Sequence, residues 1–202
     1  MDYFELFSLP RHLYIDTAAL EISFYAQSRK LHPDRFAARP PAEQEAALAA
    51  SSQLNDAYRT LRDPITRTEY LLGLEGIQLE EQSRAATDAA KVAGTEKKQV
   101  APPDLLEEAF ELNMQLEEMR MARKMGDDDP QTRADLEQAR TKFTAMLDEL
   151  QKQLEALWSR WDSAVDANDA AAKEAAKLEI VALLNRRSYV RNLVRDVNEA
   201  LE

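Results

Sequence analysis

Apolar side chains recur in alternating steps of four and three residues along the second half of the chain. The longest regular run consists of Phe143, Leu147, Leu150, Leu154, Leu157 and Trp161. Residues at this spacing share one face of an α-helix, and an apolar face that continues for about five turns must be buried against other helices. The scarcity of Gly, at 4 in 202 residues, also points to helices. The chain is therefore predicted to be all-α.

Two similar runs lie on either side of this one. The first is Leu105, Ala109, Leu112, Leu116 and Met119, and the other is Ile180, Leu183, Val190, Val194, Val197 and Leu201, which Arg187 interrupts. Turn-forming residues separate the three runs at 126–130 and 166–169. Three helices joined by short turns predict an antiparallel three-helix bundle over residues 104–202.

The first 76 residues predict a separate domain of short helices. Asp16 and Asp63 are suited to begin two of these helices, because a carboxylate accepts hydrogen bonds from the unpaired amides of the first turn. Pro33 ends the helix that Asp16 begins, since the residue before a proline is pushed out of the α-helical region.

Residues 77–103 separate the two domains and differ from both in composition. Leu and aromatic residues become rare, while Ala, Lys, Thr and Glu predominate, and the segment ends in two prolines. This composition indicates a linker and allows it to be flexible.

Composition also excludes several classes of function. With 26 Lys and Arg against 37 Asp and Glu, the formal net charge of −11 opposes a phosphate backbone, so we expect no nucleic-acid partner. No apolar run approaches the roughly 20 residues that span a bilayer, so we expect no membrane partner. The absence of Cys and the presence of only 2 His argue against a metal site, and no cofactor is expected. Asp2 and Glu5 stand where a signal peptide would be basic, which predicts a cytoplasmic protein.

The N-terminal domain carries a set of short motifs. They are Tyr3-Phe4 and Leu6 at the start, His32-Pro33-Asp34 after a basic helix, Asn55, Ala57, Tyr58, Leu61 and Asp63-Pro64 in one run, and Arg67 with Tyr70-Leu71-Leu72. A His-Pro-Asp triplet is weak evidence alone and strong evidence about twenty residues before such a run. The segment resembles a J-domain. With the acidic helical region that follows, the chain resembles the HscB family of J-type co-chaperones of iron–sulfur cluster assembly, in its bacterial, cysteine-free form.

The resemblance implies a fold and a function. The fold is a J-domain, with short helices around an antiparallel helical hairpin, followed by a three-helix bundle. Proteins of this family are not enzymes: they activate a DnaK-type chaperone ATPase, HscA, and present to it the iron–sulfur scaffold IscU. The resemblance assigns ATPase binding to His32, Pro33, Asp34, Arg29, Lys30 and Arg35.

The helix expected after residue 103 carries a second apolar stripe, about 100° away from the first. It consists of Leu106, Phe110 and Met114, with Glu107, Glu111 and Glu118 beside it. Because these acids disfavour full burial, the stripe predicts an exposed interaction face. In HscB-like proteins the scaffold binds here, and the resemblance places its site at Leu105, Leu106, Phe110, Glu111, Met114, Glu118 and Tyr189.

Other interpretations stay open on the sequence alone. A His at a helix end, a basic cluster on a solvated face and a Tyr that covers the bundle all occur without a partner. An enzyme that uses His32 and Asp34 as an acid–base pair is disfavoured, because no nucleophile, Gly-rich loop or metal ligand accompanies them. The alternative is a helical adaptor with a J-like domain and a different client. The sequence does not determine self-association.

Overall fold

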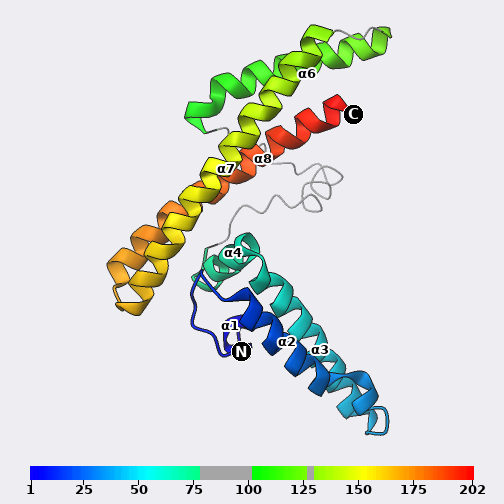
Figure 1. The fold of residues 1–202 in the computed structure, drawn as a ribbon, viewed down its shortest axis with the longest axis vertical. Coiled ribbons are helices and arrows are strands. Elements are labelled where there is room, and N and C mark those ends of the chain that lie inside the picture. Colours follow the sequence, from blue (N-terminus) through cyan, green and yellow to red (C-terminus); the bar gives the residue numbers. More distant parts are fainter. Residues whose placement is uncertain (78–101, 127–129) are drawn as a thin grey trace. The chain divides into compact units, whose positions relative to one another are not determined.

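A computed structural model describes residues 1–77, 102–126 and 130–202 (Figure 1), and over these residues it contains helices and turns but no strand. The all-α prediction is confirmed. The expected linker lies almost entirely outside the described residues. The elements are α1 (Tyr3–Leu6), α2 (Thr17–Leu31), the 3-10 turn η1 (Pro33–Arg35), α3 (Pro41–Arg62), α4 (Pro64–Leu74), the 3-10 turn η2 (Pro103–Leu105), α6 (Leu106–Met125), α7 (Pro130–Asp166) and α8 (Ala170–Leu201).

The predicted helix caps are present. The Asp16 carboxylate accepts hydrogen bonds from the amides of Ala18 and Ala19 at the start of α2, at 2.9 and 3.0 Å. Asp63 does the same for α4, where it accepts from the amides of Ile65 and Thr66 at 3.0 and 2.8 Å. Each carboxylate satisfies amides that have no partner within the helix, so both helix starts are determined locally.

The chain forms two compact units, which are described separately. The first contains α1 to α4 together with Leu157–Lys177, which is the end of α7 and the beginning of α8. The second contains η2, α6 and the remaining parts of α7 and α8. The domain limits expected at residues 76 and 104 remain a prediction.

In the first unit, α2 and α3 pack side by side as an antiparallel hairpin (Figure 1). Leu20 of α2 and Leu54 and Leu61 of α3 are buried, and the rings of Phe24 of α2 and Tyr58 of α3 stack with their centroids 4.2 Å apart. This packing holds the connection between the helices, residues 32–40, at one end of a rigid hairpin.

The loop between α1 and α2 is attached to α7 by directed hydrogen bonds within the same unit. The Asp162 carboxylate accepts from the amides of Leu13 and Tyr14 at 2.6 and 2.9 Å, and the indole N–H of Trp161 donates to the Arg11 carbonyl at 3.2 Å. Burial raises the pKa of the Asp162 carboxyl, although the two amide donors offset part of this effect. His12 Nε2 lies 2.9 Å from the Asp166 carboxylate.

The second unit has the core of a three-helix bundle. Its buried side chains come from all three helices: Leu112, Leu116 and Met119 of α6, Leu136, Phe143 and Leu150 of α7, and Val190, Leu193 and Val197 of α8. The three predicted apolar runs are buried or partly buried along their length, which confirms the bundle. Within the described ranges, no helix is long and apolar enough to cross a membrane.

Replacing Asp162 by Ala is expected to destabilise the first unit by about 2 kcal/mol, because the part-buried amide of Leu13 and the exposed amide of Tyr14 lose a charged acceptor. Asp162→Asn keeps one acceptor oxygen and should cost less. Both tryptophans lie in this unit, so urea unfolding followed by tryptophan fluorescence measures the change. As a control, Asp148→Ala removes an exposed carboxylate from α7 and should leave the midpoint unchanged; an equal loss in both variants would contradict the assignment.

Candidate functional site

The His-Pro-Asp triplet forms a tight turn at the end of the α2–α3 hairpin. His32 ends α2 with an extended backbone, at φ −59° and ψ 132°, as expected for a residue before proline. The Arg35 amide then donates to the His32 carbonyl at 3.0 Å and closes the 3-10 turn. The chain direction at this point is therefore determined by the proline and by one backbone hydrogen bond.

The His32 ring and the Asp34 carboxylate are held next to each other in solvent. His32 Nδ1 lies 3.3 Å from the Asp34 amide and 3.4 Å from the Asp34 carboxylate. A neutral ring accepts from the amide, and a protonated ring pairs with the carboxylate. The two side chains are 57 % and 89 % exposed, so a partner can reach both.

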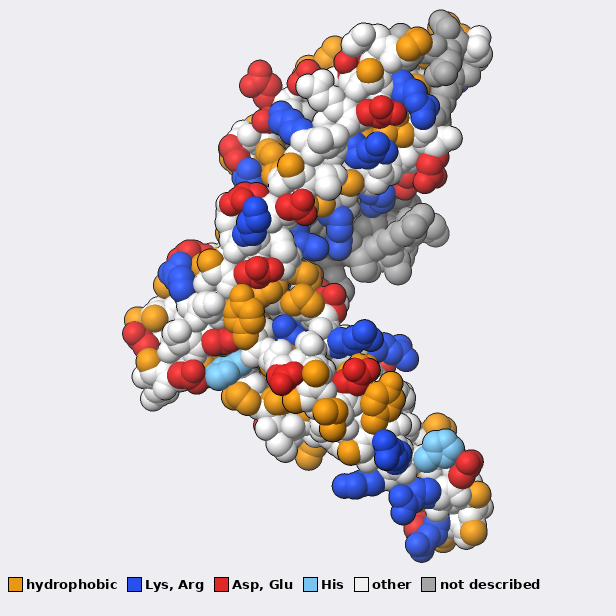
Figure 2. All heavy atoms as spheres, viewed as in Figure 1, with side chains coloured by type: hydrophobic (Ala, Val, Ile, Leu, Met, Phe, Trp, Pro, Cys, Tyr) orange, Lys and Arg blue, Asp and Glu red, His pale blue; other side chains and the backbone are white. Residues whose placement is uncertain are grey.

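Three cationic side chains surround this turn. Arg29 and Lys30 are exposed in the last turn of α2, and Arg35 is exposed at the end of η1. The Arg35 guanidinium donates to the Arg29 carbonyl at 3.4 Å, which draws the two arginines together. Figure 2 shows Lys and Arg side chains gathered beside the histidine at this end of the hairpin. We refer to His32, Asp34, Arg29, Lys30 and Arg35, on the turn that Pro33 begins, as the hairpin-tip site.

A second candidate surface lies on α6, which has one buried and one exposed apolar face. Leu105 is 1 % exposed and belongs to the core, whereas Phe110 is 67 % exposed. Leu106 and Met114 are also exposed, as are the carboxylates of Glu111 and Glu118. The spacing placed Leu105 in the buried run, whereas the resemblance placed it with the scaffold-binding residues; the structure assigns its side chain to the buried face, opposite the exposed stripe.

The exposed stripe is longer than the sequence interpretation included. Met121 and Met125 are 59 % and 82 % exposed and follow Met114 at distances of seven and eleven residues. Such distances keep them on the same side of the helix. The spacing was therefore the signal that could have identified them. We call Leu106, Phe110, Met114, Met121 and Met125 the α6 stripe.

Tyr189 occupies an intermediate position on α8. Its ring packs partly against the core of the second unit, and burial raises the pKa of its hydroxyl. One turn earlier, Arg186 donates to Asp104 at 2.6 Å and thereby joins α8 to the residues just before α6. This hydrogen bond also lowers the pKa of the Asp104 carboxyl. Tyr189 thus lies on the part of α8 that follows this link.

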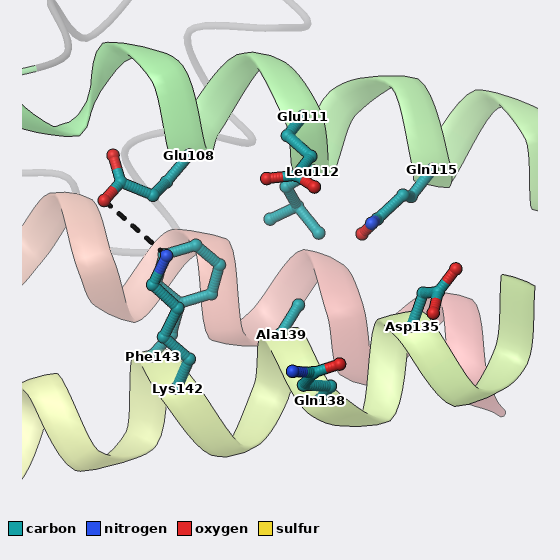
Figure 3. A pocket seen from close by; sticks show the side chains of 9 residues that line it. All are labelled: Glu108, Glu111, Leu112, Gln115, Asp135, Gln138, Ala139, Lys142 and Phe143. Atoms are coloured by element: carbon teal, nitrogen blue, oxygen red, sulfur yellow. Dashed lines mark ion pairs between the residues drawn. The ribbon is translucent and has the colours of Figure 1, made fainter.

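A polar groove of about 450 Å³ lies between α6 and α7, on the side of α6 that carries Glu111 (Figure 3). Its base is apolar, and Glu108, Glu111 and Asp135 are among the polar side chains that line it. The Lys142 Nζ lies 3.6 Å from the Glu108 carboxylate and compensates only part of the negative charge of the three acids. The groove therefore extends the negative charge beside the α6 stripe.

In the part of the chain that the structure describes, no group of three or more His, Cys, Asp or Glu side chains is arranged to hold a metal ion. The two surfaces instead consist of exposed groups suited to binding other proteins: charged and polar at the hairpin tip, apolar with acidic neighbours on α6.

The chain was compared with protein-family models and with solved structures. No family model matches it. The chaperone HscB from Vibrio cholerae is 28 % identical, with a TM-score of 0.60, and the alignment covers 98 % of this chain and 96 % of that one. The human co-chaperone protein HscB shares the fold at 24 % identity and a TM-score of 0.59, with 98 % and 81 % covered. The chain is thus similar to HscB proteins over nearly its full length, which confirms the resemblance inferred from its motifs.

Truncation should lower the stability of the protein strongly at Leu105 and hardly at all at Phe110, because the first side chain lies in the core and the second on the surface. Leu105→Ala is expected to lower the free energy of unfolding by about 3 kcal/mol, whereas Phe110→Ala should change it by less than about 0.5 kcal/mol. Urea unfolding followed by far-ultraviolet circular dichroism measures both. A large loss for Phe110→Ala would mean that its ring is buried in solution.

Proposed function

We propose that the chain is a co-chaperone of iron–sulfur cluster maturation that stimulates the ATPase of a DnaK-type chaperone, HscA, and delivers the scaffold IscU to it. The observation that carries the proposal is the hairpin-tip site, where an ordered His-Pro-Asp turn is surrounded by three cations, in a chain similar to HscB along almost its whole length. The similarity in fold and sequence supports the assignment to co-chaperones, and the two exposed surfaces support the two binding functions.

The hairpin-tip site is suited to act on the conformational equilibrium of another protein. Its turn is closed by a backbone hydrogen bond and mounted on a packed helical hairpin, so little conformational entropy is lost on binding. A rigid surface that fits one state of an ATPase better than another raises the population of that state. Arg29, Lys30 and Arg35 favour an acidic surface on the ATPase and accelerate the encounter with it.

The α6 stripe supplies the second binding function. Exposed apolar side chains such as Phe110 bind a partner by removing apolar surface from water, and Glu111 and Glu118 beside them favour a client with basic residues. A chain that binds an ATPase and a client at once raises the effective concentration of one for the other. The co-chaperone thereby presents the client without performing any covalent chemistry.

His32→Gln is expected to reduce stimulation of HscA ATP hydrolysis by about tenfold or more, because the ring that faces Asp34 at the tip is replaced by a flexible amide. Single-turnover ATP hydrolysis is the measurement. The matched control is His12→Gln, which removes the other histidine and one surface pair and should keep full stimulation.

Raising the salt concentration should increase the amount of wild-type protein needed for half-maximal stimulation. If wild-type protein stimulates neither HscA nor any other DnaK-type ATPase, the adaptor alternative becomes the better explanation.

Phe110→Ala is expected to remove only the part of the stimulation that depends on IscU. The dissociation constant for apo IscU should rise about tenfold, since an exposed aromatic anchor is lost. ATPase stimulation in the absence of IscU should match that of the wild type. Leu178→Ala, which truncates an exposed leucine on α8, serves as the control and should leave both quantities unchanged. A parallel loss of IscU-independent stimulation would contradict the separation of the two surfaces.

A further inference from the structure

The exposed apolar face of α6 runs from one end of the helix to the other. Five large apolar side chains are exposed along it: Leu106, Phe110, Met114, Met121 and Met125. At about 100° per residue they fall within about 100° of arc, and from the first to the last the helix rises about 28 Å. An apolar surface of this length is larger than the patch that the sequence placed on the first half of α6.

The two edges of the stripe carry opposite charge. Glu107, Glu111 and Glu118 are exposed along one edge. Arg120 and Lys124 are exposed on the other edge, in the second half of the helix. Glu117, which interrupts the stripe, pairs with Arg120, whereas no ion pair or hydrogen bond is found for Lys124 among the described residues. A bound segment therefore meets carboxylates on one side and the exposed ammonium group of Lys124 on the other.

We propose that the client site extends along the whole of α6 to Met125. Its occupant is an amphipathic segment of the client with an apolar stripe, basic residues on the edge that meets Glu107, Glu111 and Glu118, and an acidic residue that meets Lys124. This inference rests on the proposed function and adds the length and the charge pattern of the client segment. The methionines suit such a site, because their flexible side chains adapt to the shape of a partner.

A second copy of this chain fits the same face less well. In a twofold antiparallel pair of helices, the same edge of each helix meets its counterpart, so the edges that carry Glu107, Glu111 and Glu118 would face each other. In a parallel pair, the first halves of the two helices would meet, and Leu106–Gln115 contains three acids and no base. Like charges are brought together in both arrangements, which favours a client with complementary charge.

The test is calorimetric titration of the full chain with apo IscU. The double variant Met121→Gln and Met125→Gln removes two exposed apolar side chains and keeps good helix formers at both positions, so the fold is retained. We expect its dissociation constant to rise about tenfold. Lys124→Glu should also weaken binding, and the loss should diminish at high salt. Leu178→Gln, an equally exposed site on α8, should bind as the wild type does.

The outcomes separate this inference from the proposed function. If the double variant binds IscU as tightly as the wild type while Phe110→Ala does not, the client site ends before Met121 and the inference is overturned, but the proposed function stands. If Phe110→Ala also binds normally, the client part of the proposed function fails as well. Sedimentation velocity gives a third result: a wild-type dimer that the double variant dissociates would identify the stripe as a self-association surface and overturn the inference.

Discussion

Burial of one continuous apolar run along α7 is the interaction on which both compact units depend. Phe143 and Leu150 fill the core of the second unit, and Leu157 and Trp161 are buried in the first. Each of these side chains contributes about 1.5–3 kcal/mol of transfer free energy when it leaves water. Because the steps of four and three residues continue without a break, a single helix supplies a wall to two cores.

The two candidate surfaces differ in the physical interactions that they offer to a partner. The hairpin-tip site consists of polar groups in full contact with solvent, so its interactions weaken as salt increases. The α6 stripe is apolar, and its main contribution comes from removing surface from water, which salt does not screen. If each surface binds the partner proposed for it, the two affinities respond differently to salt.

Helix caps and the helical packing were predicted from the sequence, whereas individual long-range hydrogen bonds and the groove were not. The caps at Asp16 and Asp63 involve residues two or three positions apart, so residue type and spacing were sufficient to predict them. The hydrogen bond from the Leu13 amide to Asp162 joins residues 149 positions apart, and no periodicity in the sequence predicts it. The polar groove between α6 and α7 was not predicted either, because it depends on how two helices lie against each other.

The sequence by itself determined that the chain is helical, where its helices begin, where the His-Pro-Asp turn lies and that one helix carries a second apolar stripe, because hydrophobic period, capping and a proline turn act over a few residues. Only the tertiary structure decided between the two placements of Leu105, in the buried run and in the scaffold-binding set, and showed that the exposed stripe on α6 continues to Met125. Spacing defines the faces of a helix, but packing against α7 and α8 determines which face is buried.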